Sequence, residues 1–173
     1  LSLCAEVEPE LTLEERREAL LRLHNASWLN IWNATAAYYH ALRGEPERIP
    51  ELFAQHRLSA VNILAPGKPM MEMIENQVYL AQGACAKVIG RSEGLLAMCE
   101  GMHYALVALH VRIQTAAAYE RLGKHTEAQA LLRQALSDGE PDGLVMPFVE
   151  NYDGLAPLLA QEIRNDLIDR IVE

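Results

Sequence analysis

The chain has 173 residues, of which 15 are Lys or Arg and 24 are Asp or Glu, so its net charge is −9. An acidic surface of this kind repels the phosphate backbone, which excludes direct binding to nucleic acid. No run of 18 apolar residues and no signal-peptide pattern occurs, so we expect a cytoplasmic protein without a membrane partner. Cys4, Cys85 and Cys99 form no CxxC pair and are odd in number, which indicates reduced thiols.

Half of the residues are hydrophobic but only 6% are aromatic, a composition that favours helix packing over a sheet. In chain order, the apolar spacing predicts a capping helix at 12–24, helical hairpins at about 28–55, 70–100 and 103–137, and a closing helix at 154–172. Thr12 and Glu15 form a capping box that opens the first of these helices. The predicted fold class is therefore all-α, in a single domain over residues 1–173.

Three glycines mark the turns inside the predicted hairpins. Gly44, Gly83 and Gly123 lie 39 and 40 residues apart, and each follows an apolar helix. Around the third glycine, Ala116 and Ala128 place small side chains where two helices must approach closely. This order resembles the tetratricopeptide helical hairpin, although the period is longer than the usual ~34 residues. The resemblance implies a right-handed superhelix of antiparallel helix hairpins.

The segment 135–159 carries a more specific pattern. An Ala-Leu pair, a Pro-Asp-Gly turn, an apolar-Pro-Phe element and a Leu-Leu helix follow one another at Ala135-Leu136, Pro141–Gly143, Met146–Phe148 and Leu158-Leu159. This order resembles the last helical-repeat segment of large ATP-binding LuxR-family transcriptional regulators of the maltose-regulon-activator type. The resemblance implies an ATPase module before this segment and a helix-turn-helix DNA-binding domain after it.

Neither of those two modules is encoded in these residues. There is no GxxxxGK[ST] phosphate loop, and the last predicted helix carries acidic side chains in place of a basic recognition surface. We therefore expect a fragment of a larger regulator that contains the sensor portion alone. Contact with DNA would be made only through the helix-turn-helix domain absent from this chain.

The residue patterns contain no catalytic or metal-binding motif. The six histidines include no HExxH and no His–Cys set at zinc spacing. His103 and His110 share a helix face, for which packing or surface roles are favoured over a ligand role. We expect no enzyme activity, no cofactor and no metal.

The candidate binding residues project from the first helices of the hairpins, which line the concave side in this repeat class. They are Tyr38, Met73, Gln77, His110, Gln114, Glu120 and Arg121. This mixture suits a small polar ligand or a peptide, and the alternative is that several of them are only contacts between helices.

Two functions follow from the pattern. The first is a ligand-sensing and signal-relay domain, in which a small-molecule inducer or a regulatory protein binds the concave groove and shifts the populations of two states. The alternative is a tetratricopeptide-type protein–protein interaction scaffold without a small-molecule switch. The identity of the inducer, the target genes and a homo-oligomeric state stay open.

Overall fold

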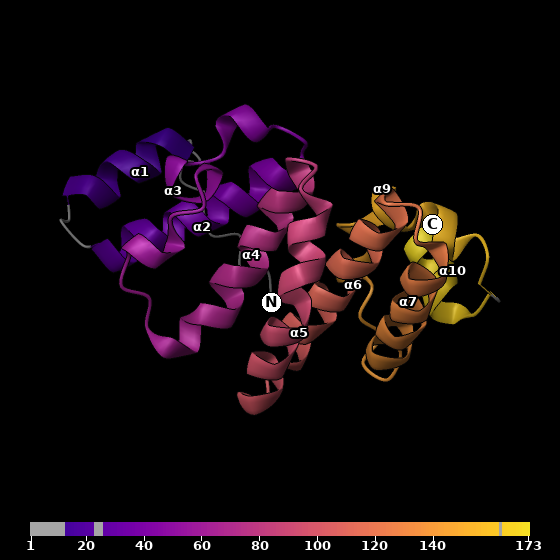
Figure 1. The fold of residues 1–173 in the computed structure, drawn as a ribbon. Coiled ribbons are helices and arrows are strands. Elements are labelled where there is room, and N and C mark those ends of the chain that lie inside the picture. Colours follow the sequence, from indigo (N-terminus) through magenta and orange to yellow (C-terminus); the bar gives the residue numbers. More distant parts are fainter. Residues whose placement is uncertain (1–12, 23–25, 163) are drawn as a thin grey trace, which may run out of the picture.

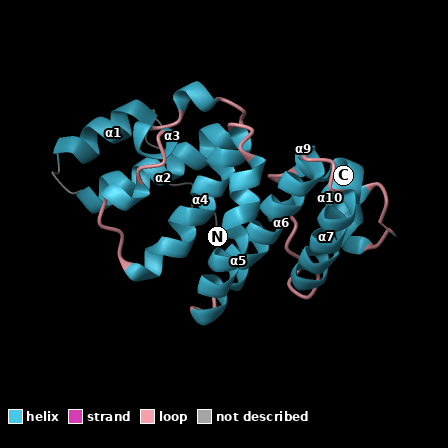
Figure 2. Ribbon diagram, in the orientation of Figure 1, coloured by secondary structure: helices cyan, strands magenta, loops and turns pink. Residues whose placement is uncertain are grey.

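The computed structural model describes residues 13–22, 26–162 and 164–173. Over these residues the chain is helical and contains no strand, as predicted (Figure 2). Its elements are α1 (Leu13–Arg22), α2 (Ala26–Leu42), η1 (Pro46–Arg48), α3 (Glu51–Ala54), η2 (Leu58–Ala60), η3 (Ala65–Gly67), α4 (Lys68–Ala81), α5 (Cys85–Gly101), α6 (Ala105–Arg121), α7 (His125–Gly139), α8 (Met146–Val149), α9 (Tyr152–Leu159) and α10 (Asp166–Val172). The Thr12 end of the expected capping box lies outside the described residues.

The three predicted turn glycines all adopt the left-handed conformation. Gly44, Gly83 and Gly123 have φ values of 66°, 73° and 72°, which an L side chain adopts only with strain. After each glycine the next amide returns to a carbonyl five residues back, and Ala84 N–H donates to Tyr79 O at 2.8 Å. These turns reverse the chain, so that α4 packs against α5 and α6 packs against α7.

The first helices of these pairs also pack against one another. Helix α2 contacts α4, α4 contacts α6, and α6 contacts α9, so the chain advances from one end of the molecule to the other (Figure 1). Helix α5 additionally packs against α6. Each helix contacts mainly its near neighbours in the chain, and the buried apolar side chains form separate clusters along the row.

The expected partner helix of the first hairpin is much shorter than the sequence predicted. Residues 47–55 form only η1 and the four-residue α3, because Pro50 follows Ile49. A residue before proline avoids the helical region, and Ile49 is extended at φ −66° and ψ 130°. Between α3 and α4 the chain forms only the short helices η2 and η3, joined by turns.

The expected single closing helix at 154–172 is wrong, since two helices replace it. Pro157 lies inside α9 and has no backbone N–H, so it cannot donate the hydrogen bond that the interior of a helix needs. Asn165 is extended and accepts a hydrogen bond from Ile168 N–H at 2.8 Å through its side chain, which starts α10 as a new helix. By contrast, α5 runs through Gly90 and Gly94 without a break.

Helix α6 lies at the centre of the fold. Its buried side chains contribute to two large apolar clusters: Val107 and Val111 pack with α2, α4 and α5, whereas Leu109 and Ile113 pack with α7, α8, α9 and α10. Ala118 belongs to a third, smaller cluster with side chains of α4 and α5. The sequence predicts this position, because the segment is apolar on nearly every face. Both clusters therefore depend on one helix.

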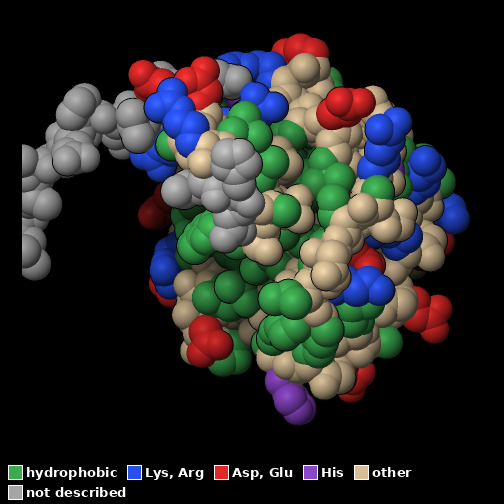
Figure 3. All heavy atoms as spheres, turned by 90° about the vertical axis from the view of Figure 1, so that its left-hand side faces the viewer, with side chains coloured by type: hydrophobic (Ala, Val, Ile, Leu, Met, Phe, Trp, Pro, Cys, Tyr) green, Lys and Arg blue, Asp and Glu red, His purple; other side chains and the backbone are tan. Residues whose placement is uncertain are grey.

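The end of the molecule that carries α1 and α2 presents both hydrophobic and charged side chains on its outer side. Hydrophobic side chains gather on this face in Figure 3, and Ile31 and Tyr39 of α2 are among the large side chains that remain exposed.

Of the helices in the described ranges, none has both the length and the apolar character that crossing a bilayer requires.

The close approach of α6 and α7 gives a test of this packing. Ala128 is fully buried in the cluster that contains Ala116, whereas Ala130 is exposed on the same helix. We expect Ala128→Leu to lower the free energy of unfolding by roughly 1–3 kcal/mol, because extra methylene groups overpack a dense core. Ala130→Leu is the matched control and should stay within about 0.5 kcal/mol of the wild type. Urea midpoints at unchanged slope measure both, and equal midpoints would contradict the packing described here.

Candidate functional site

Three of the predicted binding residues form a buried polar contact between α4 and α6. Gln114 is fully buried, and its Nε2 donates to Gln77 Oε1 at 2.9 Å and to Met73 O at 3.2 Å. Met73 and Gln77 are themselves buried. The two glutamine side chains and the Met73 carbonyl therefore hold the two helices together, and in this conformation the three residues offer no surface to a ligand.

Two further predicted residues meet a carboxylate from a distant part of the chain. The hydroxyl of Tyr38 donates to Glu150 Oε2 at 2.6 Å, and His110 Nδ1 lies 4.0 Å from the same oxygen. The Tyr38 and His110 rings pack edge to face with centroids 6.4 Å apart. Burial and the bond to Glu150 raise the pKa of Tyr38, so its hydroxyl stays protonated. The contacts among these three side chains thus join α2, α6 and the end of α8.

The last two predicted residues lie at the end of α6. Arg121 donates to Leu80 O at 2.7 Å, which joins the ends of α4 and α6. Glu120 lies 2.7 Å from His125 Nδ1 across the Gly123 turn. Neither residue contacts the Gln114 or Tyr38 groups in the described hydrogen bonds, so the seven predicted residues do not form one site.

A cavity of about 500 Å³ lies elsewhere, between the turns at 56–63, α4 and α5. We call it the His56 pocket. Its lining residues are His56, Leu58, Ser59, Val61, Asn62, Ile63, Lys68, Glu72, Glu75, Tyr79 and Arg91. The volume is in the range of pockets that bind small molecules.

The backbone at His56 is strained. His56 has a φ of 54° and ends α3 in the way that glycine ends α2, α4 and α6, since its N–H donates to Phe53 O at 3.0 Å and Arg57 N–H donates to Leu52 O. A left-handed conformation costs a non-glycine residue about 1–2 kcal/mol. The turn fixes the direction in which the imidazole leaves the backbone, toward α4.

The imidazole of His56 stacks on the ring of Tyr79, with centroids 3.8 Å apart and planes 11° from parallel. Its Nε2 lies 2.9 Å from Gln82 Oε1, and Gln82 in turn donates to Ala54 O at 3.2 Å. Its Nδ1 is buried without a hydrogen bond among the described residues, 3.6 Å from Glu75 Oε1. A buried nitrogen without a hydrogen bond costs free energy, and its presence calls for an explanation.

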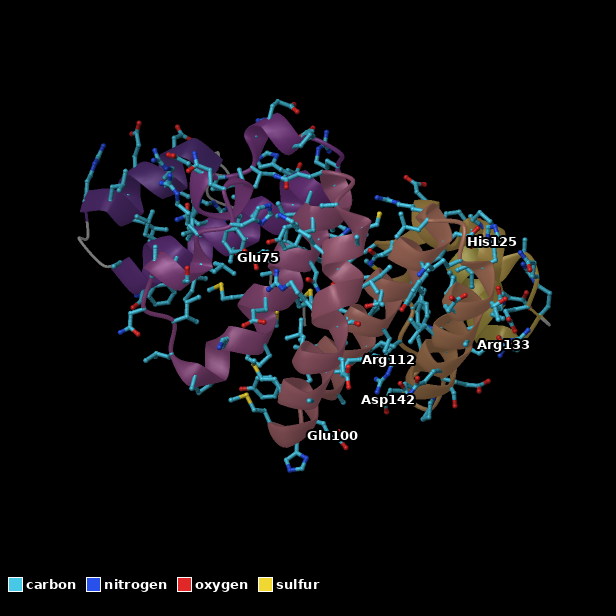
Figure 4. All side chains as sticks on the ribbon, viewed as in Figure 1. Glu75, Glu100, Arg112, His125, Arg133 and Asp142 are labelled. Atoms are coloured by element: carbon cyan, nitrogen blue, oxygen red, sulfur yellow. The ribbon has the colours of Figure 1, made fainter. Side chains whose placement is uncertain are left out.

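Charged side chains of both signs line the same pocket. Glu75, labelled on α4 in Figure 4, is buried and contacts Arg91 NH1 of α5. Glu72 lies 3.6 Å from Arg91 and 3.7 Å from Lys68. The Arg91 guanidinium is also 5.2 Å from the centre of the Tyr79 ring. Burial, followed by the Glu75 carboxylate, raises the pKa of Tyr79.

The sequence carries only a weak signal for this pocket. Glu72, Glu75 and Tyr79 are spaced three and four apart, which places them on one helix face, but this spacing equally describes a solvated face. His56 stands outside any motif, and only its place at the end of α3 brings it to Tyr79. In the part of the chain that the structure describes, no three His, Cys, Asp or Glu side chains could hold a metal ion.

His56 and His103 allow a matched test of the stacked ring. Both residues have positive φ at the end of a helix, but His103 is exposed. Glycine relieves the same backbone strain at either position. The difference in free energy of unfolding between the two variants therefore measures the contribution of the His56 side-chain contacts. We expect His56→Gly to be about 1–2 kcal/mol less stable than His103→Gly, because it loses an aromatic pair and a hydrogen bond. Equal urea midpoints would show that the His56 contacts contribute nothing.

His110 gives a prediction about pH. Burial lowers the pKa of His110 below its ordinary value of 6.5, and the Glu150 carboxylate only partly opposes this effect. The unfolded chain then binds this proton more readily than the folded chain does. The contribution of His110 to the free energy of unfolding is therefore complete above the pKa of the unfolded chain, and it decreases as the pH falls below that pKa. We expect the free energy of unfolding to fall more steeply between pH 7 and pH 5 in the wild type than in His110→Gln. Parallel curves of the free energy of unfolding against pH for the two proteins would contradict this role of His110.

Comparison with known proteins adds no relative to this description. No protein-family model, no curated protein and no solved structure matches the chain. The similarity of residues 135–159 to LuxR-family regulators therefore stays a prediction from the residues themselves, and a function has to be argued from the side chains described above.

Proposed function

We propose that this chain is a ligand-sensing domain of tetratricopeptide-like helical repeats, and that it binds a small polar molecule in the His56 pocket. The observation that carries the proposal is His56 itself. A strained residue stacks on Tyr79 and leaves a buried nitrogen without a hydrogen bond, 3.6 Å from the Glu75 carboxylate, at the wall of a cavity of about 500 Å³. Strain and an unpaired polar atom are destabilising, and a binding role accounts for their presence together.

The charges of the pocket define the class of ligand. Lys68 and Arg91 face Glu72 and Glu75 in pairs, so the lining carries two positive and two negative groups. A ligand with a net charge would leave one of these groups uncompensated in a partly enclosed site, which is unfavourable. A molecule with no net charge that has both donors and acceptors, either a zwitterion or a polyhydroxyl compound, exchanges hydrogen bonds with both kinds of group.

Helix α4 supplies a route from the pocket to the rest of the domain. Glu72, Glu75 and Tyr79 face the pocket, whereas Met73 and Gln77 on the same helix hold Gln114 of α6. A ligand that binds more tightly to one position of α4 than to another would shift the population of the two arrangements. The contact with α6 would transmit that shift to α7 and α9.

The tetratricopeptide-like superhelix and the LuxR-family assignment are parts of the same proposal. The regular left-handed turns at Gly44, Gly83 and Gly123 and the side-by-side order of α2, α4, α6 and α9 support the superhelix. The pattern of residues 135–159 supports membership in a LuxR-family regulator, for which this domain would be the sensor. Sequencing the gene on both sides tests the second part: a phosphate loop upstream and a helix-turn-helix downstream are expected, and another domain organisation would refute it.

A blocking variant tests the pocket. Ser59 lines the cavity and Ala60, beside it in η2, does not, although both are exposed. We expect a thermal-shift screen of neutral zwitterions and polyols to find a compound that, at 100 times its Kd, stabilises the fold by about 2.7 kcal/mol. For a domain of this size that raises Tm by about 5–10 °C.

The increase in Tm should persist in Ala60→Phe and disappear in Ser59→Phe, whose ring occupies the cavity. A compound that stabilises both variants equally binds somewhere else. If no compound in the screen raises Tm, the proposed ligand class is wrong.

A further inference from the structure

A second hollow lies between α5 and α7 and has a different character from the His56 pocket. Its volume is about 1190 Å³, which exceeds the usual size of a small-molecule site. The floor is the first half of α6, and α5 and α7 stand apart on either side of it (Figure 1). We call it the α5–α7 groove.

The floor and inner walls of the groove are apolar. They include Leu96 of α5, Ala105, Leu106 and Leu109 of α6, and Leu144 after α7. Leu106 is 50% exposed, so a large aliphatic side chain faces solvent in the middle of the hollow. Burying such a surface would be favourable at about 25 cal/mol for each Å² removed from water.

The rim of the groove is acidic. Glu93 and Glu100 lie on the α5 side, and Asp138 and Asp142 lie on the α7 side. The cation Arg112 is held by Asp138 at 2.9 Å, so it does not neutralise the other three carboxylates. Figure 4 labels Arg112 and Asp142 between α5 and α7, and Glu100 at the lower end of α5.

We propose that the α5–α7 groove is a docking site for a basic amphipathic helix of another protein. Such a helix would place its apolar stripe on Leu106 and Leu96 and its Lys or Arg side chains beside Glu93, Glu100 and Asp142. Charge complementarity determines this choice of partner, since an acidic rim around an apolar floor attracts a basic rim around an apolar stripe.

The structure argues against the other occupants. A second copy of this chain carries a net charge of −9 and is repelled by the same rim. An extended peptide would gain no main-chain hydrogen bonds, because helices form the walls and their amides are already bonded. The lining residues of α5 run from Ser92 to Glu100 and cover about 12 Å of the helix, so about two turns of a docked helix lie in the groove.

The test uses a fluorescein-labelled 14-residue helical peptide with leucine at positions 3, 7, 10 and 14 and lysine at the flanking positions. A second peptide keeps the leucines and replaces every lysine by glutamate. Fluorescence anisotropy at low salt should show binding of the lysine peptide to the full chain. In NMR spectra, the amide chemical-shift changes that this peptide causes should be confined to α5, α6, α7 and the turn at 140–145. The glutamate peptide should bind at least tenfold more weakly, and added salt should weaken the lysine peptide.

Two pairs of variants separate the groove from general surface effects. Leu106→Ser should weaken the lysine peptide about tenfold, whereas Leu122→Ser should not, although Leu122 is 49% exposed and lies at the other end of α6. Glu100→Lys with Asp142→Lys should weaken it at least tenfold. Glu47→Lys with Glu127→Lys makes the same change in net charge outside the groove and should weaken it less than threefold.

Several results would overturn the proposal. Equal binding of the two peptides would exclude charge complementarity, and equal effects of Leu106→Ser and Leu122→Ser would exclude the groove floor. The absence of any binding at millimolar peptide would exclude this class of partner. A change in sedimentation of the peptide-free chain on Glu100→Lys with Asp142→Lys would identify a second copy as the occupant. None of these results bears on the His56 pocket, because the two sites share no lining residue.

Discussion

The burial of most of α6 between Val107 and Ala118 is the constraint on which the rest of the structure depends. A helix surrounded by other helices has to satisfy each polar side chain internally, because water does not reach it. Gln114 meets this requirement in part, since its Nε2 donates to Met73 O and to Gln77 while its Oε1 is buried without a hydrogen bond among the described residues. Thr115 meets it by donating to Val111 O at 2.7 Å. The first of these contacts fixes how α4 is rotated against α6, so the opposite face of α4 is fixed as well.

That opposite face supplies one wall of the His56 pocket. Glu72, Glu75 and Tyr79 point away from α6, toward the turns that replace the second helix of the first hairpin. A full-length partner helix at 47–55 would present a regular surface there, whereas the break at Pro50 leaves a strained turn that delivers His56 to Tyr79. The pocket therefore results from an irregularity in the repeat, beside a regular helix that holds its charges in place.

Helix α5 contributes to both proposed sites. Arg91 pairs with the two carboxylates of the His56 pocket, while Leu96 and Glu100 line the α5–α7 groove. A ligand that repositions Arg91 would act on the same helix that a docked partner would contact. The two sites differ in chemistry for a clear reason: the pocket compensates its charges in pairs, and the groove leaves most of its carboxylates free to attract a basic partner.

The sequence by itself determined the helical class, the turns at Gly44, Gly83 and Gly123, and the central place of α6. These are local properties, because glycine adopts positive φ at low cost and a helix that is apolar on nearly every face must be buried. The shortened α3 is also a local matter that follows from Pro50. Only the tertiary structure decided which polar side chains form sites. The rotation of α6 buries Gln114, and chain reversals bring Glu150 to Tyr38 across 112 residues. Periodicity identifies the face of a helix but not the neighbour that covers it.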